Sequence, residues 1–172
     1  MKAGDRMAAI NRVLKKIPRL TYCVVVGLSV SAIINILVCQ SVRVSGSSME
    51  PSYHDGDRLI MEKVSYKMGD PERFDVVVFT HNGNYYLVKR IIGLPGETVH
   101  INPDGEIFID GRLLEEYYGM EPIDDAGVAE NTIILGSDEY FVLGDNRNNS
   151  ADSRNAGIGN VSIGEISGKI MW

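Results

Sequence analysis

The sequence predicts a mostly β, compact domain that follows a single N-terminal transmembrane helix. Three observations support this fold class: a basic segment over residues 1–19, a run without any charged side chain over residues 20–38, and short apolar-polar alternations after residue 40. Alternation with a period of two is typical of strands, and an uncharged run of this length is typical of a membrane span. We therefore expect one anchor and one β-rich domain over residues 40–172.

The basic segment and the predicted span together set the expected topology. Residues 1–19 hold six Lys or Arg and one Asp, a net charge of +5, which leaves −11 for the rest of a chain whose total is −6. A helix rises about 1.5 Å per residue, so the uncharged run is long enough for a bilayer core about 30 Å thick. The basic flank predicts a cytoplasmic N-terminus, a single-pass helix over residues 20–39 in the plasma membrane, and a following domain on its outer face.

Two other interpretations of the N-terminal region are less consistent with the residues. A cleavable secretory signal also starts with basic and apolar residues, but its apolar part covers about 7–15 residues and ends at small residues. The run here is longer and continues as Val-Cys-Gln-Ser-Val-Arg. A lipoprotein acylation site at Cys39 is disfavoured because Val38 stands where a small residue is wanted.

Charge and cysteine content exclude several classes of protein. The predicted outer domain is acidic, whereas nucleic-acid-binding domains carry a basic patch, so nucleic acid is not an expected partner. Cys23 and Cys39 are 16 positions apart on one predicted helix, about 24 Å, which is far beyond the roughly 7 Å between α-carbons that a disulfide allows. Residues 40–172 contain no cysteine, and we expect no metal and no cofactor.

Apolar-polar alternation and turn residues predict the strands of the domain. Strands are expected in residues 42–45, 57–66, 74–81, 84–93, 98–102, 106–110, 139–145 and 165–172. Asn82-Gly83 and Pro103-Asp104-Gly105 predict two hairpin turns. Residues 111–132 are acidic and lack sustained alternation, so we expect a surface excursion with a short helical turn there, whereas residues 146–164 have the Asn, Ser and Gly content of a loop.

A candidate nucleophile lies in residues 45–59, directly after the first predicted strand of the domain. A nucleophilic serine needs a tight, permissive backbone that presents its hydroxyl and offers amide donors to an oxyanion. Gly46 before Ser48 and Pro51 after it meet that need. Clusters of Ser, Gly and Pro also mark ordinary turns, so this segment alone does not establish catalysis.

A candidate base lies in the predicted strand over residues 84–93. Leu87, Val88, Ile91 and Ile92 in the same predicted strand are apolar, and a lysine in such a strand can simply extend its amine to solvent. If it is buried, desolvation disfavours the ammonium and lowers the pKa, which makes a lysine a base near neutral pH. Ser48 and a desolvated Lys89 would form a serine-lysine dyad, a variant of the serine nucleophile and base arrangement.

A third polar segment, residues 144–154, follows the apolar predicted strand that ends near Leu143. It is consistent with a solvated loop that contains an Asp152–Arg154 pair. It is equally consistent with a shell that orients the base, because a neutral lysine needs an acceptor to direct its lone pair toward the serine. Ser150 and Ser153 each offer a hydroxyl for that purpose.

Taken together, the three segments resemble the type I signal peptidase family in its compact, Gram-positive-like form. The motifs that carry the resemblance are Ser48-Met49-Glu50-Pro51-Ser52, then Lys89-Arg90-Ile91-Ile92-Gly93-Leu94-Pro95-Gly96-Glu97, and finally Gly144-Asp145-Asn146-Arg147 with Ser150, Asp152, Ser153 and Arg154. Their order along the chain and the single N-terminal span agree with the family. The resemblance covers most of residues 20–172.

The resemblance implies a role for each matching residue. Ser48 would attack the scissile carbonyl and donate its backbone amide to the oxyanion, while Lys89 would take the hydroxyl proton and return it to the leaving amine. Ser150 would hydrogen-bond the Lys89 amine, and Asp152 and Arg154 would form a structural ion pair behind it.

Met49 would shape the site beside the nucleophile. Gly46 departs from family members that have a serine there, whose hydroxyl completes the oxyanion hole, so the second oxyanion donor is open. Arg73-Phe74-Asp75 replaces the usual Arg-Gly-Asp, which we expect to be a tolerated turn variant.

The implied function is removal of signal peptides by a serine endopeptidase, with signal-peptide-bearing preproteins, the lipid bilayer and the secretion translocon as partners. A related branch uses a histidine base, but lysine occupies the base position here, so His54, His81 and His100 are expected to be structural or surface residues. Two other functions fit parts of the sequence. A membrane-tethered β-rich binding module would need neither Ser48 nor Lys89, and a self-cleaving Ser/Lys regulator would need no span and would usually carry a DNA-binding region.

Overall fold

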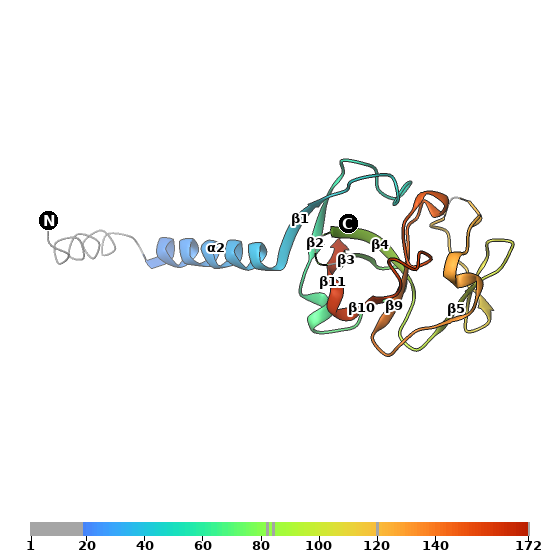
Figure 1. Ribbon diagram of the computed structural model, residues 1–172. Coiled ribbons are helices and arrows are strands. Elements are labelled where there is room, and N and C mark those ends of the chain that lie inside the picture. The colour runs from blue at the N-terminus through green and yellow to red at the C-terminus, as the bar shows by residue number, and fades with distance from the viewer. Residues whose placement is uncertain (1–18, 82, 84, 120, 172) are drawn as a thin grey trace. The chain divides into compact units, whose positions relative to one another are not determined.

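The computed structural model describes residues 19–81, 83, 85–119 and 121–171, and the chain divides into two units, Met1–Val38 and Cys39–Trp172 (Figure 1). The described part of the first unit is one helix, α2 (Arg19–Val38). The basic residues predicted to lie in the cytoplasm fall outside the described residues, except for Arg19.

Helix α2 lies where the transmembrane helix was predicted, but it ends one residue earlier. Cys39 belongs to the first strand instead, because its backbone pairs with Glu62 of the neighbouring strand. In the part of the chain that the structure describes, no helix combines the length and the apolar character that crossing a membrane requires. The structure therefore confirms a helix at this position but does not confirm that it crosses a membrane.

The second unit is built on a seven-stranded sheet in which all neighbouring strands are antiparallel, with the order β1-β2-β11-β3-β4-β9-β10. Its strands are β1 (Cys39–Arg43), β2 (Arg58–Glu62), β3 (Val76–His81), β4 (Tyr85–Gly93), β9 (Glu139–Leu143), β10 (Val161–Ser162) and β11 (Ile166–Met171). Short 3-10 turns connect some of them: η1 (Ser65–Lys67), η3 (Arg147–Asn149) and η4 (Ile163–Glu165). The mostly β, compact domain predicted from the sequence is confirmed.

A four-stranded antiparallel sheet adjoins it, with the order β7-β6-β5-β8. Its strands are β5 (Thr98–Ile101), β6 (Ile107–Ile109), β7 (Arg112–Leu113) and β8 (Ile133–Ile134). The two predicted hairpins are present as the β3-β4 and β5-β6 pairs. Of the first hairpin turn, Gly83 has the positive φ of +69° that its position requires, and Asn82 lies outside the described residues.

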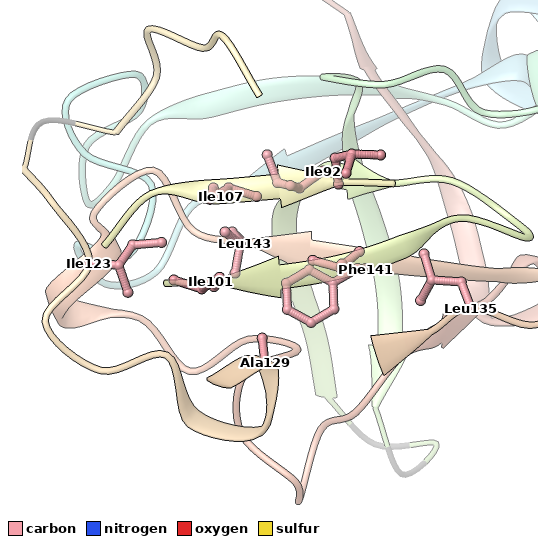
Figure 2. Packing of buried hydrophobic residues seen from close by; sticks show 10 residues of the cluster. Ile92, Ile101, Ile107, Ile123, Ala129, Leu135, Phe141 and Leu143 are labelled. Atoms are coloured by element: carbon pink, nitrogen blue, oxygen red, sulfur yellow. The ribbon is translucent and has the colours of Figure 1, made fainter. Parts of the chain in front are cut away.

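The segment over residues 111–132 is less superficial than predicted. It contains the expected helical turn, η2 (Gly127–Glu130). However, Ile123 and Ala129 are buried in an apolar cluster with residues of both sheets, so this segment closes part of the core (Figure 2). The other labelled members of the cluster are Ile92, Ile101, Ile107, Leu135, Phe141 and Leu143.

Strand β4 is the element that matters most for the site. It lies in the interior of the large sheet, paired with β3 and β9, and Ile91 and Ile92 are fully buried. Successive side chains of a strand point to opposite faces of the sheet, and every residue from Lys89 to Gly93 is buried, so both faces are covered at this end of β4. Lys89 and Arg90 are therefore only 3% and 2% exposed.

Candidate active site

The predicted nucleophile lies on the loop between β1 and β2. Backbone hydrogen bonds from Val44 N to Asp57 O (2.9 Å) and from Gly56 N to Val44 O (3.0 Å) close the base of this loop. Gly46 has φ +91°, a left-handed conformation that favours glycine, and its amide donates to Asp55 Oδ1 at 2.8 Å. The tight, permissive backbone predicted around Ser48 is thus present.

Met49 anchors this loop in the core. Its side chain is 1% exposed and packs in a cluster with Val44, Tyr53, Met61 and Val76, among others. Such packing fixes the residue directly after Ser48, so the serine backbone is held by its neighbour. The prediction that Met49 shapes the site is consistent with this burial.

Lys89 and Ser48 are in direct contact. The Lys89 Nζ atom donates to Ser48 Oγ at 2.7 Å and to the backbone oxygen of Val88 at 3.0 Å. Burial lowers the pKa of Lys89 to about 8, and the carboxylates of Asp152 and Asp145 offset part of that effect. A lysine with this pKa is partly neutral near pH 7 to 8, so it has the chemical character of a base toward the Ser48 hydroxyl.

Ser150 does not make the predicted hydrogen bond to Lys89. Its Oγ is buried and has no hydrogen-bond partner among the described residues, while the amine of Lys89 donates to Ser48 Oγ and Val88 O. Ser150 lies instead against Gly144, where an added Cβ would come within 2.2 Å of Ser150 Oγ and 2.5 Å of Ser48 O. The hydroxyl therefore lines the site without a hydrogen bond to Lys89. Ser153, the other hydroxyl considered, accepts a hydrogen bond from Val142 N at 2.9 Å.

The predicted Asp152–Arg154 ion pair is present. Arg154 donates from Nε to Asp152 Oδ1 at 2.8 Å and from Nη2 to Oδ2 at 2.9 Å, and the aspartate is 1% exposed. Asp152 Oδ2 also accepts from Gly144 N at 3.1 Å. The pair thus holds the turn that faces the carbonyl of Ser48.

A second buried ion pair was not assigned from the sequence. Arg90 donates to both carboxylate oxygens of Asp145, at 2.8 and 2.6 Å, and its guanidinium lies 3.6 Å from the ring centre of Tyr118. Arg90 also donates to Ser52 Oγ (3.3 Å) and to Phe74 O (2.9 Å). One side chain therefore joins the strand of the base, the loop of the nucleophile and the loop after β9. The sequence offered one signal for this pair: Arg90 lies within an apolar predicted strand and Asp145 lies at the end of another, with opposite charges.

Two asparagines at η3 also contact the nucleophile loop and were given no role in the sequence analysis. Asn146 donates from its backbone N to Ser48 O and from Nδ2 to Ser47 O, both at 3.1 Å. Asn149 Nδ2 donates to Ser47 Oγ at 2.9 Å. Arg147, between them, is paired with the carboxylate of Glu116. The turn is thus fixed on one side by an ion pair and holds the nucleophile loop on the other.

Phe74 occupies the position where glycine is usual in the family motif. Its φ is +73°, so the backbone keeps the left-handed conformation even though a bulky residue strains it. The ring lies 5.2 Å from that of Tyr118, and the carbonyl accepts from Arg90. The turn is present with a left-handed residue at this position, and its tolerance of phenylalanine stays a prediction.

A lysine, not a histidine, contacts the predicted nucleophile. The residue that contacts Ser48 Oγ is Lys89, and His54 is an exposed residue whose ring lies 4.0 Å from Asp57. Among the described residues, no group of three or more His, Cys, Asp or Glu side chains is arranged to hold a metal ion. The cysteines of the described chain, Cys23 and Cys39, are both free, as their spacing predicts.

The site thus combines a serine on a loop of a β domain with a buried lysine of lowered pKa that contacts its hydroxyl. The family described as signal peptidase, peptidase S26, matches residues 17–172. The chain therefore belongs to the signal peptidase S26 family.

Individual relatives agree with this membership. A probable signal peptidase I-2 of Synechocystis sp. is 40% identical over 127 residues, which cover 70% of this chain and 56% of that protein. Signal peptidase I of Leptolyngbya laminosa is 40% identical over 74% of this chain and 66% of its own length, and that of Bacillus licheniformis is 32% identical over 84% and 81%. The chain thus spans between about half and two thirds of the length of the first two relatives. A solved signal peptidase I from Enterococcus faecalis V583, 29% identical, covers 60% of this chain and 99% of its own, with a TM-score of 0.48.

Proposed function

We propose that this chain is a membrane-bound serine endopeptidase that removes N-terminal signal peptides from secreted preproteins. The observation that carries the proposal is the 2.7 Å contact between Ser48 Oγ and the buried amine of Lys89. A β-rich binding module has no need for such a contact, and a buried lysine lowers stability, a cost that a catalytic role would explain. Family membership supports the same activity.

In the proposed acylation step, Lys89 accepts the Ser48 hydroxyl proton while Oγ bonds to the scissile carbonyl carbon. The tetrahedral intermediate then collapses, the carbon-nitrogen bond breaks, and the ammonium of Lys89 gives its proton to the leaving amine. In deacylation, Lys89 takes a proton from water as the hydroxide attacks the ester, and returns it to Ser48 Oγ. The proton is held at Nζ in both steps, so a pKa of about 8 suits a base that must release it again.

The backbone amide of Ser48 is the proposed donor to the oxyanion. No hydrogen-bond acceptor for this amide is found among the described residues, so it is available to a substrate oxygen. Gly46 provides no side-chain hydroxyl, so the loop offers backbone donors only at that position. Asp152, Arg154 and Met49 are proposed to hold the surrounding backbone, and Ser150 to line the site.

Helix α2 is the proposed membrane anchor. Five of its large apolar side chains are exposed: Tyr22, Val24, Val25, Val26 and Leu28. Together with the basic residues that precede it, this surface suits a helix in the plasma membrane, with a cytoplasmic N-terminus and residues 40–172 on the outer face. Ser48 follows Val38 by ten positions, so the covalent chain keeps the nucleophile within about 33 Å of the end of the anchor. Such a tether favours substrates whose own apolar segment is in the bilayer, delivered by the secretion translocon.

Incubation of the purified full chain, in detergent with lipid, with one signal-bearing precursor tests the proposal. We expect a single new N-terminus, determined by sequencing, immediately after the signal peptide, and no cleavage by Ser48→Ala. Failure of the wild-type chain to cut several unrelated precursors would refute the assignment. Protease added outside cells should reach residues beyond Gln40, and protection there would invert the proposed topology.

A further inference from the structure

The orientation of the Ser47–Ser48 peptide is controlled from outside the nucleophile loop. Two carbonyls of this loop accept hydrogen bonds from the same residue, Asn146: Ser48 O from its backbone and Ser47 O from its side chain, each at 3.1 Å. Asn146 follows β9 and the buried Asp145, so it is attached directly to the core of the domain. The contact bridges 99 positions of sequence.

The side-chain bond to Ser47 matters because of peptide geometry. The Ser47–Ser48 bond is trans, and in a planar trans peptide the C=O and the N–H point in opposite directions. Holding the Ser47 carbonyl toward Asn146 therefore aims the Ser48 amide away from Asn146, and that amide is the proposed oxyanion donor. Within the loop, Glu50 N also donates to Ser47 O at 3.1 Å, so Asn146 reinforces an orientation that the turn alone favours.

We infer that Asn146 is a positioning residue that directs the Ser48 amide toward the oxyanion. The inference rests on the proposed function, since the amide has this role only in an acyl transfer. It also offers a reason why the loop can do without a hydroxyl at Gly46: a single backbone donor held in a fixed direction is already preorganised. Asn149, whose Nδ2 bonds Ser47 Oγ at 2.9 Å, braces the same residue without contacting the peptide plane.

Asn146→Ala and Asn146→Asp are the variants that test this, since both remove the Nδ2 donor and keep the backbone bond to Ser48 O. Removing an oxyanion donor outright costs about 100- to 1000-fold in kcat, so loss of its positioning should cost about tenfold, with KM unchanged. In Asn146→Ala the pH dependence of the rate should stay as in the wild type, because the contacts of Lys89 are untouched; Asn146→Asp adds a carboxylate near the amine and is compared by kcat at saturating pH only. Asn148→Ala is the matched control: Asn148 lies on the same turn, but its side chain bonds Pro122 O and Asp124 N, at 3.0 and 2.9 Å, instead of the nucleophile loop.

An inhibitor comparison separates orientation of the amide from general damage. A peptide aldehyde forms a tetrahedral adduct with Ser48 that places oxygen where the oxyanion develops, whereas an uncleavable peptide of the same sequence does not. The variants should weaken aldehyde binding by the same factor as kcat and leave binding of the uncleavable peptide unchanged.

Three results would each overturn the inference: wild-type kcat in a folded Asn146 variant, a rise in KM with kcat retained, or a loss that merely follows the unfolded fraction measured by thermal denaturation. An inactive wild-type chain would instead refute the proposed function, and the inference with it.

Discussion

Replacing Lys89 by methionine should abolish turnover and change how stability depends on pH. Burial holds the pKa of Lys89 at about 8, against 10.5 for the free side chain. Each unit of pKa difference is worth about 1.4 kcal/mol, so the buried ammonium lowers the free energy of unfolding by about 3 kcal/mol. Methionine has an unbranched apolar side chain that fills the same kind of space without a charge.

The sign of the pH dependence follows from where the proton binds more tightly. Because the folded pKa is lower, the unfolded state holds more protons between about pH 8 and 10.5, and wild-type stability rises with pH over that window. Below pH 8 both states are protonated, and the full cost is present. The free energy of unfolding of Lys89→Met minus that of the wild type should therefore fall by about 2.5 kcal/mol between pH 7 and pH 10.

Urea denaturation of the full chain in micelles, followed by circular dichroism at each pH, measures this difference. At any one pH, the stability difference between Lys89→Met and the wild type also includes the two hydrogen bonds lost with the amine, about 1 kcal/mol each. The test is therefore how this difference changes with pH. Lys67→Met at an exposed position is the matched control and should leave the pH dependence unaltered. A difference between Lys89→Met and the wild type that stays constant from pH 7 to pH 10 would show that the amine is not buried as described.

Three further outcomes are expected. The kcat/KM of the wild type should rise about tenfold between pH 7 and pH 9, because only neutral Lys89 is a base and its pKa is about 8; a rate independent of pH would exclude this base. Asp145→Asn should lower the free energy of unfolding by about 3 to 5 kcal/mol in urea denaturation, since it leaves the Arg90 charge buried without its counter-ion, and a loss below 1 kcal/mol would contradict that. Phe74→Gly should be more stable than Phe74→Ala by about 0.5 to 1 kcal/mol, because both lose the ring but only glycine relieves the strain of φ +73°; equal stabilities would mean that the backbone relaxes.

The strands were predictable from three local signals: alternation in some of them, runs of β-branched and aromatic residues in β3 and β4, and the turn residues between them. The prediction located every strand of four or more residues, and it missed the two-residue strands, whose existence depends on pairing. Strand β1 begins at Cys39 and not near Val42, because the partner strand β2 supplies hydrogen bonds up to Glu62. The first residue of such a strand is set by its pairing with a strand distant in the sequence. The local pattern of residues does not contain this information.

The candidate site was predictable in its members and less so in their contacts. Motif resemblance brought together Ser48 and Lys89, and the structure places them in contact. The partner of Ser150 was wrong because a lysine amine has several acceptors within reach, and which ones it takes depends on the placement of the side chain. Arg90–Asp145 escaped prediction for a related reason: 55 positions separate the two, and each alone is consistent with a solvated charge.

The buried ion pairs and the low pKa of Lys89 belong to one electrostatic arrangement. Asp152 and Asp145 both favour the protonated lysine, which works against a base, and the predicted outer domain as a whole is acidic. Each of these carboxylates is bound by an arginine, Asp152 by Arg154 and Asp145 by Arg90, with two hydrogen bonds apiece. A carboxylate neutralised by a guanidinium at such short range exerts only a weak field on a third group, so the desolvation of Lys89 outweighs it. Without either arginine, an unpaired carboxylate would hold the amine charged, and Ser48 would lose its proposed base although Ser48 and Lys89 were both still in place.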